Sequence, residues 1–276
     1  MRPSEGPGSI DVKVRTFSYE SGASGPDFTR AIAVEAPIQI VIGAAPFAVM
    51  MATPQDLEDF ACGFALTEQI AESLDDVRGL EVEPVEDGWK LRIALSSERL
   101  QAHLARGRAM SGRTGCGLCG IEDFSQIPAP SPVHPHPPPA PAAIRAALED
   151  LETRQPLNRL TGAVHAAAWC ERDGTIVLIR EDVGRHNALD KAIGALARAG
   201  VAPDGGFFVI TSRCSFEMVA KAAIFGAGTL VAVSAPTSLA LERARRFGVR
   251  LIAVARRDQA LCFEGGNGEA TGGLAA

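Results

Sequence analysis

Two cysteines stand three positions apart in the segment Ser111–Gly120, which reads Ser-Gly-Arg-Thr-Gly-Cys-Gly-Leu-Cys-Gly. A thiol attacks as its thiolate, and a free cysteine with a pKa of ~8.5 is only about 3% ionised at pH 7. The glycines beside Cys116 and Cys119 leave both sulfurs uncrowded and let backbone amides approach them, and Arg113 adds a nearby cation. Leu118 is the one apolar neighbour. The pattern predicts an exposed, mobile loop that handles sulfur.

Two other uses of a Cys-x-x-Cys pair stay open. A structural zinc site takes four ligands, usually from two such pairs; the chain has no second pair, so zinc would have to be shared between two copies. A thioredoxin-like dithiol opens a helix directly after a strand, whereas glycines flank Cys116 on both sides. The other cysteines stand singly among apolar residues and are expected in the core: Cys62, Cys170, Cys214 and Cys262.

The composition is that of a globular protein with one large domain or two smaller ones. The chain has 276 residues, of which 46% are hydrophobic and 22% charged. Its net charge of −6 indicates no general affinity for nucleic acid or for an anionic membrane. The start of the chain lacks the apolar core of a signal peptide, and charged and turn residues interrupt its most hydrophobic window, Ala31–Ala52. Together with a reactive dithiol, these features favour the cytoplasm.

Residues 1–127 are expected to form an N-terminal α+β region that ends in the cysteine loop. Helical spacing of apolar residues predicts a helix with Thr53 as N-cap and Pro54 as its first residue, and a second helix from Ser97 to about Arg106. Gly43 is expected to turn two strands into a hairpin. Strands are predicted at Val12–Tyr19, Arg30–Glu35, Pro37–Ile42, Pro46–Ala52 and Trp89–Leu95.

Residues 128–141 contain eight prolines in fourteen positions, with His134 and His136 among them. Such a run neither pairs in a sheet nor forms a helix, and it favours extended polyproline geometry. We interpret it as a linker rather than as a histidine metal site.

Residues 142–264 alternate strands with helices, which predicts an α/β domain with a mostly parallel sheet and flanking helices. Asp173-Gly174 is a strong turn signal between two of the strands. Strands are expected at His165–Cys170, Thr175–Arg180, Phe207–Thr211, Leu230–Val233 and Arg250–Ala255, and helices at Ala142–Thr153, Asn187–Ala199, Phe216–Phe225 and Leu239–Phe247. The glycine-rich residues 265–276 are predicted to be a disordered tail.

Three strand-to-helix junctions of this domain are expected at the carboxyl edge of the sheet, where such folds bind ligands. They are Glu181–Asn187, Thr211–Ser215 and Ser234–Ser238. Helix N-termini favour anions, and the first two junctions add Arg185 and Arg213, with Lys191 and Lys221 one turn further on. We interpret the edge as a phosphate site. The alternative is that Arg185 and Lys191 only pair with Glu181, Asp182 and Asp190 at the surface.

Several segments resemble the formate dehydrogenase accessory sulfurtransferases, the FdhD family. The main one is the signature Glu181-Asp182-Val183-Gly184-Arg185-His186-Asn187-Ala188-Leu189-Asp190-Lys191. The others are Met51–Pro54, Cys116–Gly120, Thr161–Ala167 and Thr211–Ala223. These segments follow one another in the family's order and at compatible spacings. Together they span roughly residues 30–255, nearly the whole expected fold.

The resemblance implies a cytoplasmic sulfur carrier. Such a protein takes sulfane sulfur from a cysteine desulfurase and passes it to the molybdenum (or tungsten) bis-guanine-dinucleotide cofactor of formate dehydrogenase. Cys116 would bear the persulfide, and Cys119 would assist or relay. The resemblance also implies a cytidine-deaminase-like fold for the second half, a homodimer and no resident metal. It further implies a cofactor-binding segment made of Val254, Ala255, Arg256, Arg257, Asp258 and Gln259.

Two other classes of function remain to be weighed. His165-Ala166-Ala167 resembles the H-x-E motif of zinc-dependent nucleoside deaminases, but Ala167 replaces the catalytic glutamate and no P-C-x-x-C follows. A non-catalytic chaperone that only binds the cofactor and formate dehydrogenase is the alternative to a sulfur carrier.

Overall fold

The N-terminal part of the chain is built on a four-stranded sheet with one helix packed on it. The computed structural model describes residues 5–107, 130–134 and 136–263, so Cys116, Cys119 and the expected tail lie outside the described residues. The sheet has the order β4–β3–β6–β5. Its strands are β3 (Ala36–Ile42), β4 (Ala45–Ala52), β5 (Val77–Val85) and β6 (Gly88–Leu95). Helix α1 (Leu57–Thr67) packs on it, and α2 (Ser97–Gly107) follows β6.

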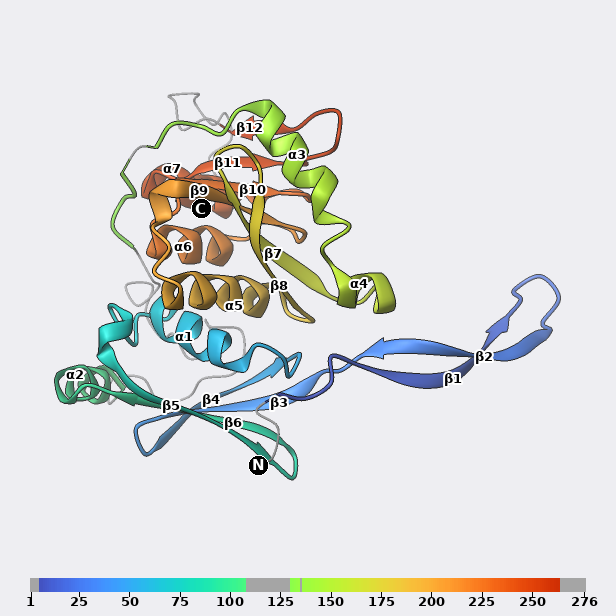
Figure 1. The fold of residues 1–276 in the computed structure, drawn as a ribbon, viewed down its shortest axis with the longest axis horizontal. Helices are drawn as coiled ribbons and strands as arrows, with labels where there is room; N and C mark the ends of the chain where they lie inside the picture. Colours follow the sequence, from blue (N-terminus) through green and yellow to red (C-terminus); the bar gives the residue numbers. More distant parts are fainter. Residues whose placement is uncertain (1–4, 108–129, 135, 264–276) are drawn as a thin grey trace, which may run out of the picture.

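A separate two-stranded ribbon precedes this sheet. Its strands, β1 (Ser9–Phe17) and β2 (Ser24–Ala33), pair antiparallel and form a sheet of their own. Figure 1 shows the ribbon extending away from the rest of the molecule.

The second sheet has six strands in the order β12–β11–β10–β9–β7–β8. They are β7 (His165–Glu171), β8 (Ile176–Asp182), β9 (Gly206–Ile210), β10 (Thr229–Ala232), β11 (Arg250–Ala253) and β12 (Leu261–Phe263). The α/β class is confirmed, but the expected mostly parallel sheet is mixed. Only the β9–β10 and β10–β11 pairings are parallel, whereas β7 is antiparallel to both β8 and β9, and β12 is antiparallel to β11. The tight Asp173-Gly174 turn forces β7 and β8 to run in opposite directions.

Helices cover both faces of this sheet. One face packs against α5 (Arg185–Arg198), α6 (Phe216–Phe225) and α7 (Ser238–Phe247). The opposite face packs against α3 (Pro141–Leu151), which is followed by the short α4 (Pro156–Thr161). The molecule is therefore layered, and in Figure 1 the order runs from α3 through the six-stranded sheet to α5, then α1, then the four-stranded sheet.

The two halves meet where α1 crosses α5. A Cβ atom on Gly63 of α1 would lie 1.7 Å from the Asp190 carbonyl oxygen, and one on Gly194 of α5 would lie 1.9 Å from the Asp59 carbonyl oxygen. Real Cβ atoms do not approach a carbonyl so closely, so only glycine permits this crossing distance. The crossing fixes the position of the N-terminal sheet relative to the six-stranded sheet.

Three expectations need correction. Helix α1 begins at Leu57, after Asp56 with a left-handed φ of 52°, because buried tertiary hydrogen bonds hold the expected cap, Thr53, elsewhere. Strand β5 was not predicted; its outward charged residues and Pro84 suit an edge strand. Cys262 is exposed on β12, whereas Cys62, Cys170 and Cys214 are buried as expected.

Candidate functional site

The mixed sheet still brings the three junctions to one edge. Strands β8 and β9 are both antiparallel to β7, so they run in the same direction, and β10 and β11 run parallel to β9. The carboxyl ends of these four strands therefore share an edge. The amino-terminal end of β7, His165, lies at that edge as well, opposite Asp182. The edge is the candidate site.

The first junction is anchored by a buried carboxylate, Asp182. It accepts hydrogen bonds from the Gly184 N–H at 2.7 Å, from Asn187 Nδ2 at 3.0 Å and from the Thr53 N–H at 3.0 Å. Lys191 Nζ lies 2.6 Å from Asp182 Oδ2 with both side chains at 0% exposure, and it donates to the Thr53 carbonyl at 2.9 Å. The alternative correctly predicted that Lys191 pairs with Asp182, but the pair is buried rather than at the surface. The phosphate contact expected of Lys191 is corrected, because its ammonium group faces the N-terminal half.

A second buried pair accounts for Lys221. Its Nζ lies 2.9 Å from both carboxylate oxygens of Asp190 and donates to Thr67 Oγ1 at 2.8 Å, with Glu68 at 3.2 Å. Burial alone would lower the pKa of Lys221, but the Asp190 and Glu68 carboxylates outweigh it and hold that pKa above its ordinary value. The expected phosphate contact of Lys221 is therefore corrected, because α6 points this side chain at α1 and away from the open edge.

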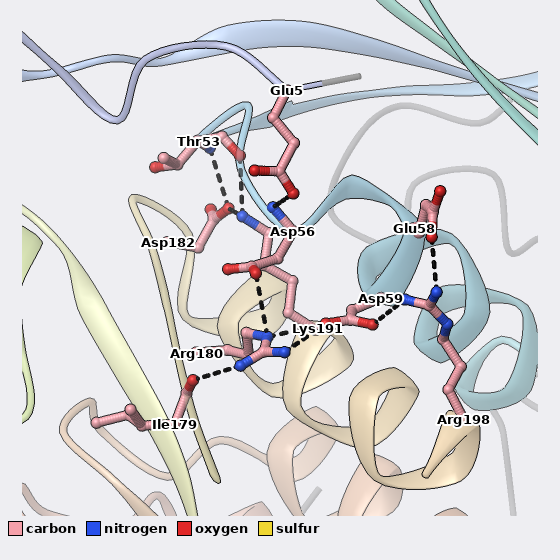
Figure 2. Close-up of polar contacts among 10 residues, drawn as sticks. All are labelled: Glu5, Thr53, Asp56, Glu58, Asp59, Ile179, Arg180, Asp182, Lys191 and Arg198. Atoms are coloured by element: carbon pink, nitrogen blue, oxygen red, sulfur yellow. Dashed lines mark hydrogen bonds and ion pairs between the residues drawn. The ribbon is translucent and has the colours of Figure 1, made fainter. Parts of the chain in front are cut away.

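Further ion pairs between the two halves of the molecule lie along α1 and β8. Figure 2 shows Arg180 and Arg198 converging on Asp59 of α1, at 2.7 Å for Arg180 Nη2 and 2.5 Å for Arg198 Nη1, with Glu58 paired to Arg198 at 2.6 Å. These ion pairs join α1 of the N-terminal half to β8 and α5 of the second half.

Arg185 and His186 remain at the edge itself. Arg185 Nε is a buried nitrogen atom without a hydrogen-bond partner among the described residues. His186 Nε2 lies 3.3 Å from Glu217 Oε2, and the Ser215 hydroxyl donates to the same oxygen at 2.7 Å. Burial by itself raises the pKa of Glu217, but the contacts with His186 and Ser215 and the charge of Arg185 lower it below its ordinary value. Glu217 thus links the first junction to the second as an anion.

His165 borders this cluster as a neutral ring. Burial and then the positive charge of Arg185 lower its pKa, and Asp182 offsets only part of that shift. A half-buried neutral imidazole can accept a hydrogen bond without adding charge to the edge.

The second and third junctions are joined through their backbones. Cys214 forms a parallel bridge with Pro236, with its N–H donating to the Ala235 carbonyl at 3.2 Å. Arg213 is exposed beside this bridge, and the Thr237 hydroxyl caps α7 by accepting from the Ala240 N–H at 3.3 Å. The Arg213 side chain is therefore exposed to solvent at the edge.

The segment after β11 reaches the third junction through its first residues. Val254 has a left-handed φ of 52° and donates its N–H to the Ser234 carbonyl at 3.1 Å. Arg256 Nη1 donates to the Val233 and Ala255 carbonyls, which keeps this guanidinium at the edge. Ala255 is buried in the core under α3, so the expected side-chain contact of Ala255 with a ligand is corrected.

The rest of that segment turns away from the cluster. Arg257 pairs with Glu152, the residue after α3, at 2.7 Å, with both side chains more than half exposed. Asp258 and Gln259 are exposed, and no hydrogen bond brings their side chains to the edge among the described residues. Of the six positions, Arg256 is the one whose polar side chain the structure holds there.

Thr53 and Glu217 are the residues that sequence reasoning missed in these roles, although both lie in segments that carried the family resemblance. The residues that the structure describes hold no group of three or more His, Cys, Asp or Glu side chains that could ligate a metal ion. Within the same residues, no helix is long and apolar enough to cross a membrane.

Comparisons with known proteins agree with this architecture. The sequence profile of the FdhD/NarQ family matches residues 33–268. A relative from Xanthomonas axonopodis pv. citri (strain 306), named sulfur carrier protein FdhD, is 46% identical over 251 residues, covering 91% of this chain and 88% of that protein. A relative of the same name from Cupriavidus necator is 46% identical over 226 residues, covering 82% and 78%. A crystal structure from Desulfotalea psychrophila, described as a formate dehydrogenase accessory protein, shares the fold with a TM-score of 0.73 at 24% identity, covering 93% of this chain and 97% of that chain.

Proposed function

The chain belongs to the FdhD/NarQ family, and from this premise we propose that it is a sulfur carrier that serves formate dehydrogenase. The observation that carries the proposal is the edge of the six-stranded sheet, where Arg185 lies in the first junction, Arg213 in the second, and Arg256 in the segment after β11. A buried nitrogen atom there, Arg185 Nε, has no hydrogen-bond partner among the described residues. An edge of this kind suits a polyanion.

The polyanion is the substrate that receives sulfur. A molybdenum bis-guanine-dinucleotide cofactor carries two diphosphate groups, and guanidinium groups bind phosphate through paired, charge-assisted hydrogen bonds. Arg185, Arg213 and Arg256 would hold these diphosphates, and the buried Arg185 Nε would gain an acceptor.

Cys116 is the sulfur acceptor in this proposal. Its thiolate attacks the outer sulfur of a cysteine desulfurase persulfide, the S–S bond of that persulfide breaks, and the desulfurase thiolate leaves. Burial raises the pKa of Cys62 to about 11 and those of Cys170 and Cys214 to about 12, so these three thiols stay protonated near neutral pH. Cys262 is exposed but stands singly on β12, so the proposal assigns sulfur transfer to the paired thiols of Cys116 and Cys119.

Cys119 would relay or release the sulfur. If its thiolate attacks Cys116 Sγ, a Cys116–Cys119 disulfide forms and the outer sulfur leaves as sulfide, with both electrons supplied by the two thiols. A cellular dithiol then attacks that disulfide, is itself oxidised to a disulfide, and leaves both thiols of the carrier restored. The proposal places the protein in the reducing cytoplasm as a homodimer. Its sulfurtransferase activity would be coupled to the maturation of formate dehydrogenase.

Maturation of formate dehydrogenase in cells that lack their own carrier tests the function. The wild-type chain is expected to restore formate dehydrogenase activity, and Cys116→Ala is expected to abolish it. Cys262→Ala removes an exposed thiol outside the motif and serves as the control. Full maturation by Cys116→Ala would favour a non-catalytic chaperone that binds the cofactor and formate dehydrogenase.

A further inference from the structure

A groove lies between the two halves of the molecule, at the ends of α5 and α6 that are remote from the candidate site. Its volume is about 750 Å³, within the ~300–1,000 Å³ typical of binding pockets. At about 1.5 Å per residue, the length of α5 between Arg185 and Ala197 is about 18 Å, which separates the groove from the edge. The floor of the groove is apolar and comes from the carboxyl-terminal parts of α1, α5 and α6 and the residue that follows α5: Leu66, Ile193, Ala197, Val201, Ile224 and Phe225.

This floor is an open margin of the hydrophobic core. Leu66, Val201 and Phe225 are only partly buried, and they pack against the core of the second half. The ring of Phe225 lies edge-on to the rings of Trp169 and Phe208, with centroids 5.5 Å apart in both pairs. Because buried neighbours hold these side chains, the floor is preformed, which lowers the cost of ordering it when a partner binds.

The rim of the groove is acidic. Glu72, Ser73 and Asp75 line it from the segment between α1 and β5, and all three are exposed. Arg99 of α2 also lies on the rim, but its guanidinium lies 2.6 Å from Glu72 and 3.7 Å from Asp76. These two carboxylates outweigh the charge of Arg99, and Asp75 adds a further negative charge. The rim therefore attracts a cationic partner.

An apolar floor inside an acidic rim fits an amphipathic helix of another protein. Such a helix lays its apolar face into a hydrophobic groove, with anchoring side chains three, four and seven residues apart. Lys or Arg residues at the margin of that face would meet Glu72 and Asp75. Charge complementarity of this kind speeds the encounter and disfavours acidic partners.

We propose that the groove docks a basic amphipathic helix of the protein that donates sulfur to Cys116, an inference that rests on the proposed function. Helix α2, which carries Arg99, is the last described element before Cys116 in the sequence, and Figure 1 shows it on the side where α1 ends. A donor docked here therefore contacts the part of the fold that leads into the cysteine segment.

The position of the groove favours the sulfur donor over formate dehydrogenase as the occupant. Formate dehydrogenase has to take the cofactor from the edge, where Arg185, Arg213 and Arg256 lie. The groove is at the other end of α5, so a protein docked in it leaves the edge open. The carrier could thus receive sulfur while the cofactor is bound.

Persulfide loading of Cys116 in the full chain, measured over a range of cysteine desulfurase concentrations, tests the inference through the rim. Asp75→Lys reverses a charge on the rim, and Glu86→Lys makes the same change in the turn between β5 and β6, outside the groove. Asp75→Lys is expected to raise the desulfurase concentration that gives half the maximal loading rate about three- to tenfold at low salt, and less as ionic strength rises. Glu86→Lys should change it less than about twofold.

The floor is tested by filling it. Ala197→Trp places an indole ring in the groove, and Ala199→Trp places the same ring at the exposed residue that ends α5. Ala197→Trp is expected to raise the same desulfurase concentration at least about tenfold at every salt concentration, whereas Ala199→Trp should change it less than about threefold. Loading by inorganic polysulfide needs no docking, so it should be equal in all these chains.

A groove variant that the desulfurase loads as readily as its control overturns the inference and leaves the proposed function standing. A wild-type chain that the desulfurase never loads overturns the proposed function, and the inference with it. Photo-cross-linking covers the case in which a groove variant does not fold. Benzoylphenylalanine at position 73, on the exposed rim, should capture the desulfurase, and at position 86 it should not. Equal capture at the two positions, or capture at neither, overturns the inference.

Discussion

Asp182 and Lys191 form an ion pair of 2.6 Å between side chains that are both fully buried. Asp182 ends β8 and Lys191 lies in α5, yet both reach Thr53, which belongs to the other half of the molecule. The pair therefore places the amino terminus of α5, with Arg185 and His186, relative to the N-terminal sheet. Asp182 and Lys191, which both belong to the family signature, therefore hold the edge of the sheet in place.

Removing the cation of this pair should destabilise the fold strongly. Lys191→Met leaves the Asp182 carboxylate buried without its cation, and breaking a buried pair costs about 3–5 kcal/mol. The free energy of unfolding from urea titrations measures the loss. Lys13→Met on the exposed ribbon of β1 and β2 should change it by no more than about 0.5 kcal/mol. A loss equally small for Lys191→Met would show that the pair does not anchor the junction.

The helix crossing should tolerate no side chain at Gly63. In Gly63→Ala the new methyl group would meet the Asp190 carbonyl, and overpacking of this kind costs about 1–3 kcal/mol or more. Thermal unfolding should show a lower Tm for this variant. Gly205→Ala is the control, because a Cβ there meets nothing within 4 Å. Equal Tm values for the two variants would refute the close crossing.

The stability of the protein should depend on His165 in mild acid. Its pKa in the folded state is below the ordinary 6.5, so below that value the unfolded chain binds the proton more readily than the folded chain. The resulting loss in the free energy of unfolding begins as the pH falls below 6.5, and it stops increasing once the pH is below the pKa of His165 in the folded state. In urea unfolding between pH 7.5 and 5, the wild type should therefore lose more stability than His165→Gln. Parallel curves for the two proteins would contradict a depressed pKa.

Loss of Arg185 should weaken anion binding at the edge. A hydrogen bond to a charged group contributes about 1.5–3 kcal/mol, or roughly 10- to 150-fold in affinity. Calorimetry with guanosine diphosphate as the probe should show a loss of this size in Arg185→Met. Arg145→Met, on the exposed face of α3, supplies the control with one cation fewer. The same affinity in both variants would place the anion elsewhere.

Local patterns predicted the elements of the second half well. Helix α6 has the expected bounds, Phe216–Phe225, because Ser215 precedes it in extended conformation and Gly226 ends it with a left-handed φ of 95°. The edge was also predicted, since strand-to-helix junctions collect there whether or not antiparallel β7 lies between β8 and β9.

The destinations of individual side chains were harder to predict. Lys191 and Lys221 follow the junctions at the positions expected of phosphate ligands, but buried Asp182 and Asp190 pair with them. These pairs depend on the position of α1, which no local pattern encodes. Asn187 and Lys191 are four residues apart and share a helix face, which is the signal that could have assigned both to one partner segment, the Met51–Thr53 backbone before α1.

Mass spectrometry of Cys116 tests the central claim most directly. The chain is incubated with a cysteine desulfurase and cysteine, digested without reductant, and compared with a sample that lacks the desulfurase. The account predicts a peptide containing Cys116 that is heavier by one sulfur atom, absent from the control and from Cys116→Ala. Formate dehydrogenase matured by a chain that never carries that sulfur would contradict it.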